Sequence, residues 1–83
     1  MNQAMPKAIA KKKRFVVCVR NTGYPASLEL RKIYQALPDA DAEAHSLVRV
    51  IDESGEDYLY PEQFFRDLDL PQDVETALRR ATG

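Results

Sequence analysis

Residues 47–60, LVRVIDESGEDYLY, constrain the fold more than any other part of the chain. An apolar, β-branched run leads into a polar segment that contains Ser54 and Gly55, and a second short run follows and ends before Pro61. Gly55 can adopt positive φ without steric penalty and Ser54 can hydrogen-bond to nearby backbone, whereas β-branched and aromatic side chains suit a pleated strand. The pattern therefore predicts a β-hairpin.

Two more segments predict strands on either side of this hairpin. Residues 15–20 begin with five consecutive apolar residues, which is typical of a short central strand buried on both faces. After the hairpin, residues 61–64 predict a tight turn, and residues 65–68 predict a last short strand. The chain is therefore expected to be rich in strands.

Residues 27–37 fit two templates. Leu30, Ile33, Tyr34 and Leu37 follow the spacing of one helix face, and Ser27 is available as an N-cap. The strand template places Leu28, Leu30, Tyr34 and Ala36 on one face, interrupted by Lys32. The pattern alone favours the helix.

The C-terminal residues predict a short helix over residues 71–82. Pro71 suits a first turn, acidic Asp73 lies near the positive end of the helix dipole, and basic Arg79 lies near the negative end. An apolar stripe runs along the segment, made of Val74, Ala77, Leu78 and Ala81. Before the hairpin, the acidic connection over residues 38–45 predicts at most one helical turn.

Charge divides the chain into a basic start and an acidic body. Residues 1–20 hold six basic side chains and no acid, whereas residues 39–75 hold twelve acids and two arginines. Residues 1–14 have no hydrophobic periodicity, so they predict a disordered basic arm ahead of a domain at residues 15–70. The start of the chain lacks the apolar run of a secretory signal and no stretch is long enough to span a bilayer, which predicts a cytoplasmic protein without membrane attachment.

Several segments together resemble a group of small, uncharacterised bacterial and phage-related proteins with an SH3-like barrel. The segments are residues 15–19, 21–24, 32–39, 48–52 and, most specifically, the Gly-Glu-Asp-Tyr-Leu-Tyr-Pro element at 55–61. The resemblance covers about residues 14–70 and implies that residues 32–37 form a strand, preceded by a long loop over residues 23–31. Arg31 departs from it, because similar sequences often have Gly there.

The resemblance and the residues together predict a mainly β fold, a small SH3-like barrel of about five strands with a short C-terminal helix. The resemblance implies no activity.

Catalytic and metal-binding patterns are missing from the sequence. Its serines lie in no nucleophile motif, and His45 is the only histidine. The acids at Asp52, Glu53, Glu56 and Asp57 lack the spacing of a calcium-binding loop. A single cysteine, Cys18, lies within an apolar run and is expected to be a buried thiol. We therefore expect a non-catalytic protein with no cofactor and no metal.

Two groups of residues are candidate binding sites. Tyr24, Tyr58 and Tyr60 are expected to meet on one face and to bind an extended or proline-rich peptide, with the nearby acids selecting basic residues in that peptide. The alternative interpretation is that these tyrosines are core residues.

The second candidate is the basic cluster of Lys11, Lys12, Lys13 and Arg14, which suits nucleic-acid phosphates through counterion release. The expected role is thus a monomeric interaction module that binds protein or peptide, with a nucleic-acid accessory protein as the alternative.

Overall fold

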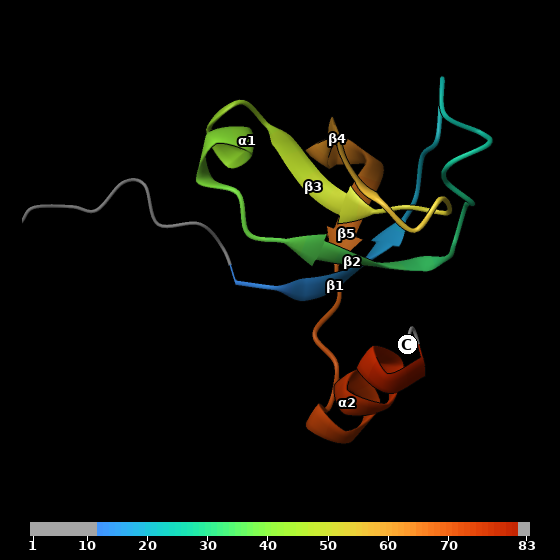
Figure 1. Cartoon of the computed structure of the whole chain (residues 1–83), viewed down its shortest axis with the longest axis vertical. Helices are drawn as coiled ribbons and strands as arrows, with labels where there is room; N and C mark the ends of the chain where they lie inside the picture. Colours follow the sequence, from blue (N-terminus) through green and yellow to red (C-terminus); the bar gives the residue numbers. More distant parts are fainter. Residues whose placement is uncertain (1–11, 82–83) are drawn as a thin grey trace, which may run out of the picture.

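A computed structural model describes residues 12–81, which form five antiparallel strands curled into a half-barrel and a short C-terminal helix (Figure 1). The strands follow one another in the order β4-β3-β2-β1-β5 across the sheet. Their bounds are β1 Arg14–Cys18, β2 Ile33–Leu37, β3 Leu47–Ile51, β4 Asp57–Pro61 and β5 Phe65–Asp67. The predicted mainly β fold with about five strands and a C-terminal helix is confirmed.

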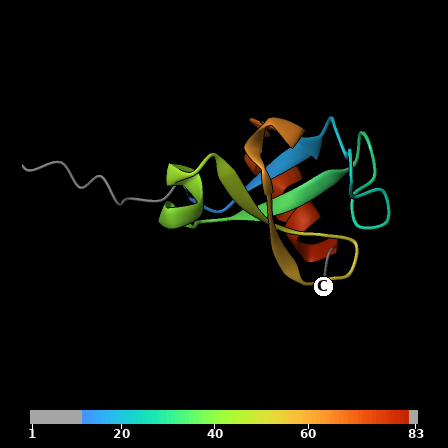
Figure 2. The same cartoon turned by 90° about the horizontal axis from the view of Figure 1, so that it is seen from above.

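Three helical segments connect or follow the strands. They are α1 Ala40–Ala44 before β3, the 3-10 turn η1 Glu62–Phe64 between β4 and β5, and α2 Gln72–Ala81 after β5. Two views at right angles place α2 on the outer side of the sheet, near β1 and β2 (Figure 2). None of the helices in residues 12–81 has the length and apolar character that crossing a membrane requires.

The core lies on the concave side of the sheet and follows strand alternation. Successive strand residues point to opposite faces, so every second side chain enters the core. The buried cluster consists of Val16, Cys18, Leu28, Tyr34, Ala36, Val48, Val50, Tyr60, Phe64 and Phe65. As expected, Cys18 is a buried free thiol, and burial raises its pKa.

Both faces of β1 are largely covered, as its apolar run predicts. Val16 and Cys18 point into the core, and Phe15 on the opposite face is also buried and shares a hollow with Leu78 of α2. The strand is shorter than predicted, because it ends at Cys18 and Val19 is 46% exposed.

Residues 27–37 form a loop and a strand, so the helix that the pattern favours is wrong and the strand implied by the resemblance is correct. Arg31 adopts φ 68°, a left-handed conformation that interrupts any right-handed helix. Its N–H donates to the Cys18 carbonyl at 2.7 Å, and the Cys18 N–H donates to the Lys32 carbonyl at 2.9 Å. These bonds begin the pairing of β2 with β1, and β2 then pairs with β3 on its other side.

The predicted hairpin is formed by β3 and β4, and its turn uses the expected residues. Gly55 has φ 85°, and its N–H donates to the Asp52 carbonyl at 2.9 Å. The Ser54 hydroxyl and N–H both donate to the Asp52 carboxylate. Local side-chain bonds and one glycine therefore fix this turn.

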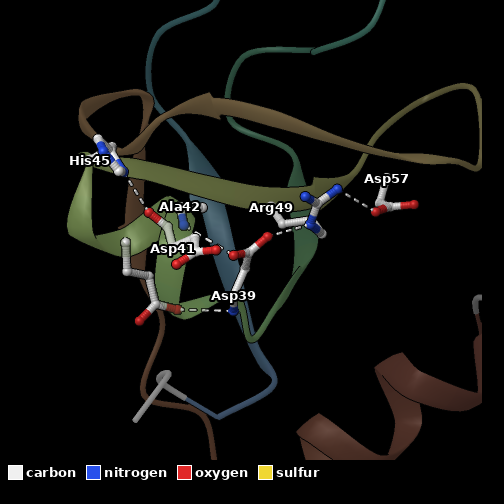
Figure 3. Close-up of polar contacts among 7 residues, drawn as sticks. Asp39, Asp41, Ala42, His45, Arg49 and Asp57 are labelled. Carbon is white, nitrogen blue, oxygen red and sulfur yellow. Dashed lines mark hydrogen bonds and ion pairs between the residues drawn. The ribbon is translucent and has the colours of Figure 1, made fainter. Parts of the chain in front are cut away.

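Asp39 organises the connection between β2 and β3 (Figure 3). Its carboxylate accepts a hydrogen bond from the Ala42 N–H at 3.0 Å and so caps α1. The other carboxylate oxygen of Asp39 pairs with Arg49 of β3 at 2.8 Å, and Arg49 also pairs with Asp57 of β4 at 2.8 Å (Figure 3). The N–H of Ala42 and the Arg49 guanidinium hold the pKa of Asp39 below its ordinary value.

Candidate functional site

The three tyrosines of the predicted peptide site lie together. Tyr24, in the loop after β1, meets the Tyr60 ring edge-on with centroids 4.9 Å apart and the Tyr58 ring at 6.1 Å. Tyr58 and Tyr60 are alternate residues of β4, and their centroids are 5.1 Å apart. The expectation that these rings meet on one face is met by the geometry.

The three rings differ in accessibility. Tyr60 is 1% exposed, whereas Tyr58 is 52% exposed and Tyr24 is partly buried. Tyr60 therefore packs beneath the rings of Tyr24 and Tyr58 as a core residue and is not part of the exposed surface. The exposed aromatic surface consists of Tyr24 and Tyr58, and we call it the Tyr24–Tyr58 surface.

Phe64 also contributes to this cluster, although the sequence did not suggest it. Its ring lies 6.1 Å from that of Tyr24, at an interplanar angle of 69°. Phe64 ends the 3-10 turn that follows β4, in a segment whose pattern indicated only a tight turn. The single available signal was an aromatic residue four positions after Tyr60, which does not distinguish a core residue from a site residue.

Hydrogen bonds attach the loop that contains Tyr24 to the β3–β4 hairpin. The Tyr60 hydroxyl donates to the Asp52 carboxylate and lies 3.0 Å from the Ser27 hydroxyl. The Glu53 N–H donates to the Ser27 carbonyl at 3.1 Å. Burial and the Asp52 carboxylate raise the pKa of Tyr60 to about 12. At neutral pH the phenol is protonated and stays bonded to Asp52, and its contact with the Ser27 hydroxyl ties the loop to the hairpin.

A second tyrosine ties the same loop to the hairpin from the other side. The Tyr34 hydroxyl donates to the Glu53 carboxylate and accepts a bond from the Glu29 N–H at 2.8 Å. Glu53 also pairs with Lys32 at 2.6 Å, and this ion pair together with the Tyr34 bond lowers the pKa of Glu53. Burial, followed by the Glu53 carboxylate, raises the pKa of Tyr34 above its ordinary value. Hydrogen bonds of Tyr34 and Tyr60 thus attach the loop beside the Tyr24–Tyr58 surface to the hairpin.

The hairpin side of this surface is acidic. Residues 50–65 contain no lysine or arginine and five acids, namely Asp52, Glu53, Glu56, Asp57 and Glu62. Glu56 and Glu62 are exposed, whereas Asp57 is paired with Arg49. A ligand that reaches this side would meet uncompensated carboxylates at both ends of β4.

The predicted nucleic-acid site is divided by the fold. Lys11 lies outside the described residues, and Lys12 and Lys13 are exposed. Arg14 instead belongs to β1, where its Nε pairs with Asp67 of β5 at 3.0 Å and its side chain is only 15% exposed. Arg14 is therefore not available to the basic cluster. Because Arg14 belongs to β1, the predicted arm over residues 1–14 extends one residue too far.

Two of the hollows in the described part of the chain lie away from the Tyr24–Tyr58 surface. One, of about 440 Å³, lies between the outer face of the sheet and α2 and is bordered by Phe15, Ile33, Ile51 and Leu78. The other, of about 410 Å³, opens between β1, β3 and β5, and Arg14 Nη1 at its border is buried without a hydrogen-bond partner among residues 12–81. Within the described chain, no group of three or more metal-ligating side chains is placed to hold a metal ion.

Comparison of the chain with models of known protein families, with curated proteins and with solved structures finds no match in any of the three. The function is therefore inferred from the residues of this chain and their geometry.

Proposed function

We propose that this chain is a non-catalytic interaction module with an SH3-like half-barrel that binds an extended peptide through the Tyr24–Tyr58 surface. Support for the barrel type comes from the strand order, in which β5 returns to pair with β1 while β3 and β4 form a hairpin at the other edge. This architecture hosts many functions, so the binding proposal depends on the site and not on the fold.

The observation that carries the proposal is Tyr58, a large aromatic side chain that is 52% exposed yet held by contacts with two other rings. An aromatic ring with few rotatable bonds loses little conformational entropy on binding, which is why tyrosine is common in binding surfaces. Because Tyr24 and Tyr60 already restrict the ring, Tyr58 is presented in a preorganised position. The exposed acids beside it favour a ligand with basic side chains.

The nucleic-acid alternative has weaker support. Its described and exposed cations are Lys12 and Lys13, because Arg14 is paired with Asp67. Phosphates approaching the hairpin side would also meet its carboxylates. We further propose that the protein acts as a monomer in the cytoplasm.

The test is selection of a displayed library of random short peptides on the full chain, followed by affinity measurement of the selected peptides. Tyr58→Ala should weaken their binding by about tenfold or more, as is typical of an aromatic anchor. Leu30→Ala is a matched control, because Leu30 is similarly exposed at 48% but is not part of the aromatic cluster. Thermal unfolding would establish that both variants remain folded.

A library that yields no binder, or binders that tolerate both Tyr58→Ala and Tyr24→Ala, would refute the proposal. Binding that disappears on removal of residues 1–13 and weakens steeply with salt would instead support the nucleic-acid or polyanion alternative.

A further inference from the structure

We propose that the peptide binds as an added strand along the free edge of β4, and that it alternates apolar and basic side chains. This inference rests on the proposed function, because the edge borders the Tyr24–Tyr58 surface. It specifies which backbone groups hold the ligand and which ligand sequence is favoured.

The hydrogen-bond alternation of the hairpin identifies the backbone groups on this edge. Beyond one end of the β3–β4 ladder the Asp52 N–H donates to the Glu56 carbonyl, and beyond the other end the Glu62 N–H donates to the Ser46 carbonyl, both at 3.0 Å. Opposed pairs in an antiparallel ladder alternate between bonded and non-bonded. Counting inward from either end of the ladder therefore assigns the same residue pairs as bonded.

With this alternation and the observed register, Tyr58 and Tyr60 form the bonded pairs with Val50 and Val48. The N–H and C=O groups of Asp57 and Leu59 must therefore point away from β3. No hydrogen bond to these four groups occurs among residues 12–81, and β4 is the last strand on its side of the sheet. Two donors and two acceptors in strand spacing are thus available to an extended chain.

The opposite edge of the sheet is less suitable. In β5 the same reasoning directs the backbone groups of Phe65 and Asp67 outward. However, the Phe65 N–H already bonds the Glu62 carbonyl, and the Phe65 carbonyl accepts a bond from Arg66 at 2.9 Å. Within residues 12–81, only Asp67 of β5 retains free backbone groups, so β4 provides the longer template.

The side chains beside the β4 edge define the ligand. On one face of the sheet an added strand would lie next to Tyr58, which favours an apolar or aromatic residue. On the other face it would lie next to Asp57, which uses one carboxylate oxygen to pair with Arg49 and has no bond to the other within residues 12–81. Exposed Glu56 and Glu62 lie just beyond the two ends of β4. Since successive residues of a strand point to opposite faces, the complementary peptide alternates apolar residues with lysine or arginine.

A second copy of the chain is a poor occupant of this edge. Antiparallel pairing of two β4 strands about Leu59 would place Asp57 opposite Pro61, which has no N–H, and would bring Glu56 near Glu62 of the other copy. Both the missing donor and the like charges oppose this pairing. The occupant we infer is therefore a segment of another protein.

The test uses the full chain, isotopically labelled for NMR, and a synthetic peptide of alternating valine and lysine with blocked ends. In the complex, amide hydrogen exchange of Asp57 and Leu59 should slow by about tenfold or more, because their N–H groups become bonded. Exchange at Tyr58 and Tyr60 should change much less, since these amides already bond β3. A peptide with glutamate in place of lysine, and one with N-methylated valines, should each bind about tenfold more weakly or worse.

Leu59→Pro is a complementary variant, because it removes an outward N–H without removing a bond to β3. It should weaken binding, and the exchange measurement on the unmodified chain decides the question if this variant does not fold.

The outcomes separate the two proposals. If library-selected peptides bind through Tyr58 but leave Asp57 and Leu59 unprotected, or if the valine–lysine peptide does not bind, strand addition is wrong and the proposed function stands. If no peptide binds, both are wrong. Protection of Asp57 and Leu59 that appears without peptide and increases with protein concentration would identify a second copy as the occupant and overturn the inference.

Discussion

The Tyr60 hydroxyl donates a hydrogen bond to the Asp52 carboxylate, which joins the penultimate residue of β4 to the start of the hairpin turn. The same carboxylate accepts two bonds from Ser54. Burial opposes ionisation of Asp52, but the bonds from Ser54 and Tyr60 outweigh it, and the pKa of Asp52 is lowered. This contact connects the core, the turn and the Ser27 loop.

Tyr60→Phe should therefore lower the free energy of unfolding by about 1–3 kcal/mol, the usual effect of removing a hydrogen bond to a charged, partly buried group. Tyr58→Phe is the matched control, because the Tyr58 hydroxyl has no hydrogen bond among the described residues and the ring is half exposed. Denaturant unfolding would measure both. Equal loss in the two variants would show that the Asp52 contact contributes nothing.

Alkaline pH should destabilise the protein through the same phenol. The pKa of Tyr60 is raised to about 12 in the folded state, against about 10 for an unfolded tyrosine. The folded state then holds the proton more tightly, so this contribution is complete below pH of about 10 and is lost as pH rises toward about 12. Unfolding free energy measured across this range should fall less steeply in Tyr60→Phe than in the unmodified chain, and parallel profiles would contradict the assignment.

Arg31→Gly should stabilise the fold by about 1 kcal/mol. Arg31 is exposed and has φ 68°, a conformation that costs a residue with a Cβ about 1–2 kcal/mol. Glycine avoids this cost, but its greater conformational freedom in the unfolded chain offsets part of the gain in stability. Glu29→Gly is the control in the same loop, because Glu29 does not have positive φ and should lose stability. A higher melting temperature for Arg31→Gly alone would support this reasoning, and a lower one would refute it.

Asp39 has two roles that substitutions can separate. Asp39→Ala removes both the cap on α1 and the pair with Arg49, and should lower the free energy of unfolding. Asp39→Asn retains a capping oxygen and should lose less stability than Asp39→Ala. If both variants lose the same amount in denaturant unfolding, the ion pair dominates and the cap does not.

The hairpin could be predicted from the sequence because its determinants are local. Ser54 and Gly55 act within a few residues of Asp52, so composition and order suffice to identify the turn. The C-terminal helix was also predictable, since charges at its two ends and its apolar spacing are properties of one segment.

The segment before β2 was misleading because its structure depends on distant residues. Leu30 and Ile33 belong to a helical stripe in the pattern, yet they are 48% and 38% exposed, while Leu28 is fully buried. Backbone bonds to Cys18 and strand pairing on both sides of β2 outweigh the local preference. The strand was predicted from the resemblance and not from the pattern. Arg31, where similar sequences often have Gly, has positive φ.

The candidate site was only partly predictable for the same reason. Alternation within β4 places Tyr58 and Tyr60 on one face, but no sequence pattern distinguishes the half-exposed ring from the buried one. The sequence likewise places Arg14 in a basic cluster, because it does not reveal that Asp67, over fifty positions away, pairs with Arg14. The outward N–H groups of β4 depend on ladder alternation, which the order of residues does not reveal.

Pro61 ends the exposed edge of β4 with a residue that lacks an N–H. Growth of a cross-β fibril requires each strand to offer an uninterrupted series of donors and acceptors to the next chain. Here that series stops after Leu59, and the neighbouring carboxylates repel further copies. We therefore expect this edge to accept a short ligand but to disfavour stacking of further copies of the chain.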